Sequence, residues 1–308
     1  MIIKSLEESI LFTLSYFDVF ELPLTFFEVW RYLFCFKAEL HEIMETLDEM
    51  IRNGKIEMKN GFYFLPERSD LVLKRQEKYD ISEKFWNKAI KAAKILSYLP
   101  FIKSIAVVNS LAFFNCDKKS DIDFLIITER NKIWTARALS SVLMHILGLR
   151  RYGKKVAKRI CLSFYISEEK LDLSYIAKNN LGFFVAFWIA QSAPLINKGR
   201  AFNRFKDSNM WVSRYLPNTG HNITNYYIDF KYPVLSSFVS KTLEFLLRPH
   251  FVENMARAIQ TKHIKRVQEK IGDPISVMFN DYILKFHPVD LRIEYKRELE
   301  KRLKKFFR

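Results

Sequence analysis

The chain has 308 residues, of which 49% are hydrophobic and 27% are charged, a composition typical of globular protein. At roughly 150 residues per domain, this length predicts two or three domains. The 8 glycines form neither a G-x-x-x-x-G-K-[ST] phosphate-binding loop nor a G-x-G-x-x-G dinucleotide-binding motif. The sequence therefore argues against a P-loop ATPase and against a Rossmann-type dinucleotide-binding enzyme.

The net charge of +16 is unevenly distributed. Residues 1–66 contain 6 basic and 11 acidic residues, a net charge of −5, whereas the other 242 residues contain 44 and 23, a net charge of +21. A basic body favours an anionic partner such as a nucleotide, a nucleic acid or a membrane surface. Plain solubility is the alternative explanation.

The three cysteines are widely spaced and form no C-x-x-C pair. Neither a disulfide framework nor a structural zinc site is expected, and the predicted location is the reducing cytoplasm. Charged residues interrupt the N-terminal segment, which argues against a signal peptide. The most apolar run, residues 181–190, is too short to cross a bilayer of about 30 Å, so we expect no transmembrane segment.

Residues 1–67 are predicted to form a winged helix-turn-helix. Three segments with helical apolar spacing precede two β-prone runs that flank Asn60-Gly61, the dipeptide most typical of a tight hairpin. The third helix carries five carboxylates, which DNA phosphates would repel, so we expect packing or a protein contact rather than DNA binding. The predicted helices are residues 5–19, 26–35 and 38–52.

The expected fold class is α+β. One or two connecting helices, with a start near Ser82, are predicted over residues 68–99. A domain with a small mixed sheet is predicted over residues 100–200, and a helical C-terminal region over residues 201–308. Within these, residues 171–196 are predicted to form one long apolar helix.

Residues 101–128 carry the clearest chemical signal in the chain. Two buried-type strands, Ile102–Val108 and Ile122–Thr128, are separated by a short helical turn and a polar turn. Asp121 and Asp123 are two positions apart, so on a strand both carboxylates lie on one face, with Cα atoms roughly 6.5 Å apart. Two such carboxylates are suited to sharing Mg²⁺, which prefers oxygen ligands.

A candidate phosphate-binding turn precedes this pair. The strand-to-helix turn at Asn109 and Ser110 is predicted to direct backbone N–H groups and a hydroxyl toward a phosphate. Lys118 and Lys119 are candidate phosphate ligands because they are close to the aspartates in sequence. Phosphate-binding groups and metal-binding carboxylates at one edge of a sheet are the equipment for metal-assisted nucleotidyl transfer.

This stretch resembles the DNA polymerase beta-like nucleotidyltransferase superfamily, in particular its minimal bacterial nucleotidyltransferase domains, some of which carry a winged helix. The family pattern is a strand, Gly-Ser, about ten residues, and Asp-x-Asp on the next strand. Here Ser110 is followed by ten residues and then Asp121-Ile122-Asp123. The resemblance implies that Asp121 and Asp123 are catalytic and hold Mg²⁺ or Mn²⁺, and that Ser110 holds the β- and γ-phosphates of an NTP.

The chain departs from the family pattern at two places. Asn109 replaces the glycine that lets the backbone approach the triphosphate closely. The family usually has a third carboxylate on a later strand, but residues 159–166 contain no acid, and Cys161 or Ser163 takes that position. The acids that come just after this strand, and so are candidates to replace it, are Glu168, Glu169 and Asp172.

Two further basic segments have an open role. Residues 150–159 contain six basic residues and are either a phosphate or RNA contact or a solvated loop. The basic amphipathic tail from Glu294 is suited to RNA, to an acidic partner or to a membrane surface. Docking on the acidic N-terminal module and plain solvation are the favoured alternatives.

The expected function is that of a nucleotidyltransferase that moves an NMP from an NTP to an RNA, a protein or a small molecule. The alternative is a catalytically weak or inactive nucleotide-binding protein whose winged helix recruits a protein or, less favoured, binds DNA.

Overall fold

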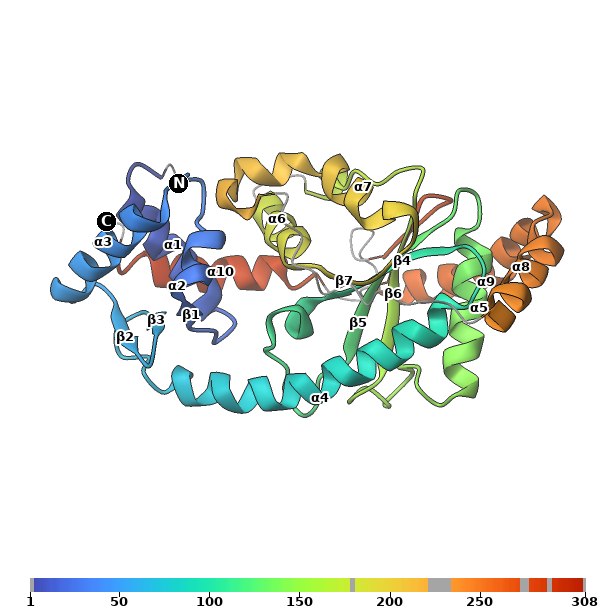
Figure 1. Cartoon of the computed structure of the whole chain (residues 1–308), viewed down its shortest axis with the longest axis horizontal. Coiled ribbons are helices and arrows are strands. Elements are labelled where there is room, and N and C mark those ends of the chain that lie inside the picture. The colour runs from blue at the N-terminus through green and yellow to red at the C-terminus, as the bar shows by residue number, and fades with distance from the viewer. Residues whose placement is uncertain (1–2, 178–180, 221–233, 272–276, 287–289, 307–308) are drawn as a thin grey trace.

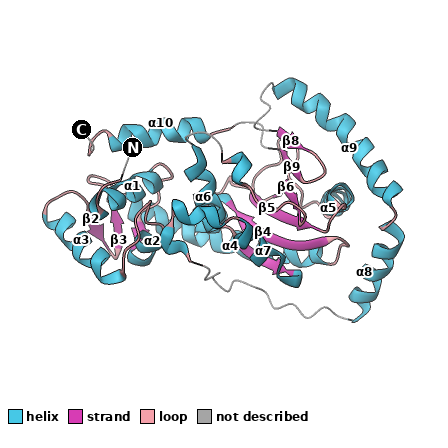
Figure 2. Cartoon of the chain, turned by 90° about the horizontal axis from the view of Figure 1, so that it is seen from above, coloured by secondary structure: helices cyan, strands magenta, loops and turns pink. Residues whose placement is uncertain are grey.

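The computed structural model describes residues 3–177, 181–220, 234–271, 277–286 and 290–306. Its architecture is α+β, as predicted: a central mixed sheet has helices on both faces and a smaller N-terminal unit at one end (Figures 1 and 2). Within the described ranges, no helix is both long enough and apolar enough to cross a membrane.

The N-terminal unit consists of three helices and a three-stranded antiparallel sheet. Thr25 caps the second helix in a reciprocal capping box with Glu28. The hairpin turns at Asn60 and Gly61, which both have a positive φ, as its tight turn requires. The hairpin and the three predicted helices are therefore confirmed, but the second helix ends at Arg31, four residues before its predicted end at residue 35. The elements are α1 (Leu6–Asp18), β1 (Leu24–Thr25), α2 (Phe26–Arg31), α3 (Leu40–Arg52), β2 (Glu57–Lys59) and β3 (Phe62–Phe64), with sheet order β1-β3-β2.

One continuous helix, α4 (Leu71–Ser97), runs from this unit along the sheet (Figure 1). The prediction of a helix start at Ser82 is wrong, because Ser82 lies in the middle of α4. Its side chain is fully buried, and its Oγ accepts a hydrogen bond of 2.9 Å from the backbone N–H of Cys116. Ser82 thus serves a tertiary contact with the turn before the Asp pair.

The central sheet contains six described strands in the order β7-β4-β5-β6-β9-β8. Among them, β5 and β6 pair in parallel, and the other neighbours are antiparallel. The parallel connection runs through the helix α5 (Ile133–Ile146), which packs on β6. The strands are β4 (Ile102–Val108), β5 (Ile122–Thr128), β6 (Ile160–Ser167), β7 (Ala193–Asn197), β8 (Val277–Phe279) and β9 (Ile283–Phe286).

The predicted long helix over residues 171–196 is wrong. The described part of this segment contains a 3-10 turn at Ser174–Ile176, the helix α6 (Gly182–Gln191) and then the edge strand β7. Pro194 explains why the helix cannot continue, since proline has no N–H to donate and its ring clashes with the preceding turn. An edge strand tolerates proline, and Pro194 lies opposite Ala106 of β4.

The C-terminal region was predicted to be helical, but it also supplies two strands to the sheet. The hairpin of β8 and β9 pairs with β6. Its turn is stabilised by Asn280, whose Oδ1 accepts hydrogen bonds from the backbone N–H groups of Tyr282 and Ile283. Residues 221–233 of the predicted helical region lie outside the described residues. The described helices are α7 (Ala201–Ser208), α8 (Val234–Leu247), α9 (His250–Ile271) and α10 (Arg292–Leu303).

Two hydrophobic clusters cover the opposite faces of the sheet. Leu125 and Ile127 of β5 contribute to the cluster that includes residues of α1, α3, α6, α7 and α10. Phe124 and Ile126 belong to the other cluster, with residues of α4, α5 and α9. Because successive side chains of a strand point to opposite faces, one strand supplies both cores. The N-terminal unit therefore shares a hydrophobic core with one face of the sheet.

The helix α10 returns along the molecule to lie beside α1. The N- and C-terminal parts of the described chain therefore lie at the same end of the molecule (Figures 1 and 2). Leu299 and Leu303 of α10 are buried in the shared core. Arg302 forms an ion pair of 2.6 Å with the buried Asp18 of α1. The basic tail therefore docks on the acidic N-terminal module, one of the alternatives that the sequence left open.

Candidate functional site

The predicted turn and Asp pair line one cavity of about 510 Å³. Asn109 and Ser110 follow the end of β4, and Asp121 and Asp123 lie at the start of the neighbouring strand β5. The antiparallel register places Val108 directly opposite Asp123, which brings the turn beside the carboxylates. The structure thus brings together four of the predicted site residues.

Asn109 has a left-handed backbone with a φ of 59°. Asparagine tolerates this conformation better than most residues, and glycine tolerates it best. Its side-chain amide donates a hydrogen bond of 2.8 Å to Asp123 Oδ2, and its Oδ1 accepts one of 2.9 Å from Trp188 Nε1. Asn109 therefore connects the Asp pair to α6, a role that glycine would not provide.

Asp121 and Asp123 have different partners. Arg151 Nη1 lies 2.6 Å from Asp121 Oδ2 in an ion pair, and Asp123 receives the amide of Asn109. Arg151 belongs to the basic segment 150–159, and its backbone N–H donates to the carbonyl of Ile160 at the start of β6. That bond places the arginine beside the Asp pair, so this segment is more than a solvated loop.

Burial, and after it the negative charge of Asp121, raises the pKa of Asp123 to about 6. The amide of Asn109 opposes this shift because it stabilises the charged carboxylate. Crowding of two carboxylates in a partly buried place is unfavourable unless positive charge compensates it. In the structure, Arg151 supplies part of this compensation through its ion pair with Asp121.

The strand β6 brings Cys161, not a carboxylate, to the Asp pair. Cys161 lies opposite Asp123 in the parallel ladder and is 5% exposed. Its Sγ and one carboxylate oxygen each of Asp121 and Asp123 lie within 4.8 Å of one another. Ser163, the other residue that the sequence allowed here, has its Oγ 3.2 Å from Cys161 Sγ.

The candidate replacement acids lie elsewhere. The backbone N–H of Glu168 donates to the carbonyl of Thr128 at the far end of β5. Thr128 lies five positions along the strand from Asp123, a distance of about 17 Å. Glu169 follows Glu168 directly, and Asp172 accepts hydrogen bonds from Ser174. The structure does not bring these three acids to the Asp pair.

Lys118 and Lys119 are also not among the residues that line the cavity. They are exposed in the turn before β5, which closes by a hydrogen bond of 2.9 Å from the backbone N–H of Asp117 to Ser120 Oγ. Lys285 of β9 and Arg292 of α10 contribute the positive side chains of the cavity wall instead. Arg292 is paired with Asp290 at 2.5 Å.

Aromatic side chains form much of the cavity wall. They come from α1 and the turn after it, from the turn after β4, from β6, from α6 and from α10, and no local sequence pattern connects these segments. Sequence reasoning therefore missed these residues, because only the tertiary arrangement brings them together. They are Tyr16, Phe20, Phe113, Phe164, Phe184, Trp188 and Tyr295.

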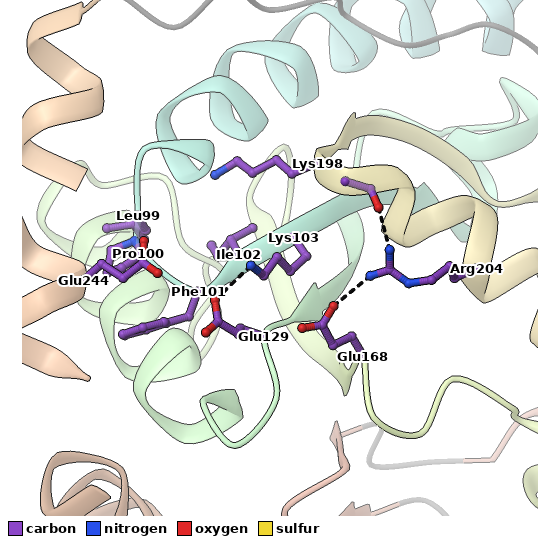
Figure 3. Close-up of a pocket in the computed structure, with 11 residues that line it drawn as sticks. Leu99, Pro100, Phe101, Ile102, Lys103, Glu129, Glu168, Lys198, Arg204 and Glu244 are labelled. Atoms are coloured by element: carbon purple, nitrogen blue, oxygen red, sulfur yellow. Dashed lines mark hydrogen bonds and ion pairs between the residues drawn. The ribbon is translucent and has the colours of Figure 1, made fainter. Parts of the chain in front are cut away.

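A second cavity, of about 220 Å³, lies at the other end of the strands (Figure 3). Its charged side chains pair with one another, Lys103 with Glu129 at 2.9 Å and Arg204 with Glu168 at 2.7 Å. Burial, with a smaller effect from the positive charge of Lys103, lowers the pKa of Lys198 to about 8. The paired charges are typical of a structural network, so the cavity with the Asp pair is the candidate site.

No protein-family model matches this chain, and no curated protein or solved structure matches it.

Proposed function

We propose that the protein is a nucleotidyltransferase that moves an NMP from an NTP to an acceptor that is an RNA, a protein or a small molecule. The observation that carries this proposal is the shared cavity of Asp121, Asp123 and Ser110. Its volume of about 510 Å³ is within the usual range for ligand pockets, roughly 300–1,000 Å³. The match of the spacing from Ser110 to Asp121 with the nucleotidyltransferase superfamily supports the same reaction.

The donor set fits a divalent cation, Mg²⁺ or Mn²⁺ in the family. Asp121 and Asp123 each offer a carboxylate oxygen on the same side of β5. A bound cation would neutralise the charge that develops on the phosphates during transfer. In this proposal, the Ser110 hydroxyl and the turn at Asn109 bind the β- and γ-phosphates. Transfer breaks the bond between the α-phosphorus and the bridging oxygen, forms a bond to the acceptor oxygen and releases pyrophosphate.

The aromatic wall supports nucleotide binding as well. Base-to-aromatic stacking contributes about 1–3 kcal/mol per base and tolerates any base. Trp188 and Phe164 of this wall have ring centroids 5.1 Å apart, on the same side of the sheet as Asn109. We assign the base to this part of the cavity and the phosphates to Ser110.

The direct test is transfer of label from α-labelled NTPs, each supplied in turn with Mg²⁺, Mn²⁺, Zn²⁺ or Co²⁺ and a pool of RNA and lysate acceptors. We expect a labelled product whose size identifies the acceptor class. The control is the double variant Asp121→Asn and Asp123→Asn, which should abolish transfer. Absence of both transfer and NTP binding in the wild-type protein would refute the proposal.

The second candidate is a nucleotide-binding protein with little or no turnover. It is favoured by the side chain opposite Asp123, a cysteine where the family has a third carboxylate. NTP binding that does not depend on a divalent cation, without transfer, would support this candidate over the first.

In either case we assign the N-terminal unit to the winged-helix class and to a protein partner. Carboxylates dominate the exposed face of α3, and phosphate contacts supply most of the affinity of non-specific DNA binding. The exposed residues include Glu42, Glu45, Asp48 and Glu49. Tight duplex binding with a steep salt dependence would contradict this assignment.

A further inference from the structure

Cys161 is the one thiol that the structure places with the Asp pair in a group of possible metal ligands. Its Sγ and the carboxylate oxygens of Asp121 and Asp123 lie within 4.8 Å of one another. Small side-chain rotations would bring all three to the distances that one ion needs, about 2.3 Å from sulfur and about 2.0–2.2 Å from oxygen. This placement is produced by the sheet, because the parallel register sets Cys161 directly opposite Asp123. The side chain is 5% exposed, so the thiol is held in a fixed environment.

A thiolate changes which metal such a group prefers. Mg²⁺ takes oxygen ligands almost exclusively and requires near-octahedral geometry. Zn²⁺ accepts cysteine sulfur together with carboxylate oxygen, and soft thiolate ligands favour metals of this kind over Mg²⁺. Two carboxylates and one cysteine are therefore a donor set better matched to Zn²⁺ or Co²⁺ than to Mg²⁺.

We propose that Cys161 is the third ligand of the metal held by Asp121 and Asp123, and that the site is selective for thiophilic divalent cations of the Zn²⁺ and Co²⁺ class. This inference rests on the proposed function in that it uses the same carboxylate pair. Binding through sulfur replaces the S–H bond with a metal–sulfur bond and releases the proton to solvent.

Arg151 marks the position that the cation takes. Its Nη1 is 2.6 Å from Asp121 Oδ2 and 3.6 Å from Cys161 Sγ, so a positive group already bridges two of the three ligands. The metal must displace this guanidinium. The Arg151 side chain is 39% exposed, which leaves it room to turn toward solvent.

The test is a Co²⁺ titration of the full chain, followed by the thiolate-to-cobalt charge-transfer absorption, which only a sulfur ligand produces. We expect the band in the wild-type protein and in the control Cys35→Ser, which removes an exposed thiol outside the ligand group. Cys161→Ser should lose the band. Its Zn²⁺ affinity, measured by calorimetry, should fall at least about tenfold, since loss of a second-shell partner already costs 10- to 100-fold.

Two further variants make the test independent of whether Cys161→Ser folds. Cys161→Asp builds an all-oxygen group and should lower the ratio of Zn²⁺ to Mg²⁺ affinity at least about tenfold. Arg151→Gln keeps all three ligands and removes the competing charge, so it should bind Zn²⁺ more tightly. Circular dichroism verifies the fold of each variant.

The inference is overturned if wild-type protein binds Co²⁺ without the charge-transfer band, or if the band persists in Cys161→Ser. It is equally overturned if Cys161→Asp leaves the Zn²⁺ to Mg²⁺ ratio unchanged. These outcomes do not affect the proposed function, which fails only if label transfer and NTP binding are absent.

Discussion

Asn109 both adopts an unusual backbone conformation and supplies two side-chain hydrogen bonds. Its left-handed φ of 59° is a conformation that glycine adopts most readily. Its side chain then connects Trp188 to Asp123 through two hydrogen bonds. A glycine would relieve the backbone but leave the indole N–H and the carboxylate without these partners.

Two substitutions of Asn109 separate the contribution of its hydrogen bonds from the steric cost of its backbone conformation. Asn109→Ala loses both hydrogen bonds and retains an unfavourable φ, so we expect a loss of about 2–3 kcal/mol in the free energy of unfolding. Asn109→Gly loses the same bonds without the steric cost, and its loss should be about 1 kcal/mol smaller. Urea denaturation of both variants measures the difference. Equal losses would mean that the backbone conformation at this position costs nothing.

At the scale of elements, the parallel pairing of β5 with β6 determines the composition of the site. A parallel strand needs a crossover connection, here through α5, and the chain re-enters the sheet next to the Asp pair. The entry of β6 brings Cys161 opposite Asp123 and anchors Arg151 beside Asp121. Glu168, which follows β6, is carried to the opposite end by the same geometry.

The packing of α10 against α1 also belongs to the scale of elements. Two positions on α10 test this packing. Leu299 is 2% exposed in the shared core, whereas Ile293 of the same helix is 54% exposed. Leu299→Ala should lower the free energy of unfolding by about 2–5 kcal/mol, because it leaves a cavity between α10 and α1. Ile293→Ala, the matched control, should change it by less than about 0.5 kcal/mol. Urea denaturation compares them, and similar effects at both positions would contradict docking.

At the scale of the whole molecule, the candidate site depends on three distant parts of the chain. Tyr16 of α1, Asp123 of β5 and Tyr295 of α10 line the same cavity. The opposite charges of the N-terminal module and the tail support this arrangement, since buried Asp18 of α1 is paired with Arg302 of α10 at 2.6 Å. A ligand in this cavity would contact both the sheet and the N-terminal unit.

Nucleotide binding should therefore stabilise the whole chain. A ligand at 100 times its dissociation constant adds about 2.7 kcal/mol to the folded state, which should raise Tm by several degrees. A thermal melt with NTP and divalent cation, compared with each alone, measures the shift. The double variant Asp121→Asn and Asp123→Asn should show little or no shift from the combination. A shift of the same size in this variant would place the nucleotide elsewhere.

Local patterns in the sequence were sufficient for the N-terminal helices, the hairpin at Asn60-Gly61, the strands β4 and β5, and the common face of Asp121 and Asp123. These features depend on neighbouring residues, through helical periodicity, turn preferences and the alternation of side chains along a strand. Each of these patterns extends over only a few positions of the chain, so the features that it determines can be predicted without knowledge of the fold.

Only the tertiary structure decided what surrounds that pair. It placed β7, β8 and β9 in the sheet, chose Cys161 for the position opposite Asp123, and brought Arg151 to Asp121. Strand pairing and burial in a shared core join residues far apart in the chain, and their register is set by the packing of whole elements. No local pattern around Cys161 encodes its partner, which is why the group of Asp121, Asp123 and Cys161 is recognised only once the sheet is assembled.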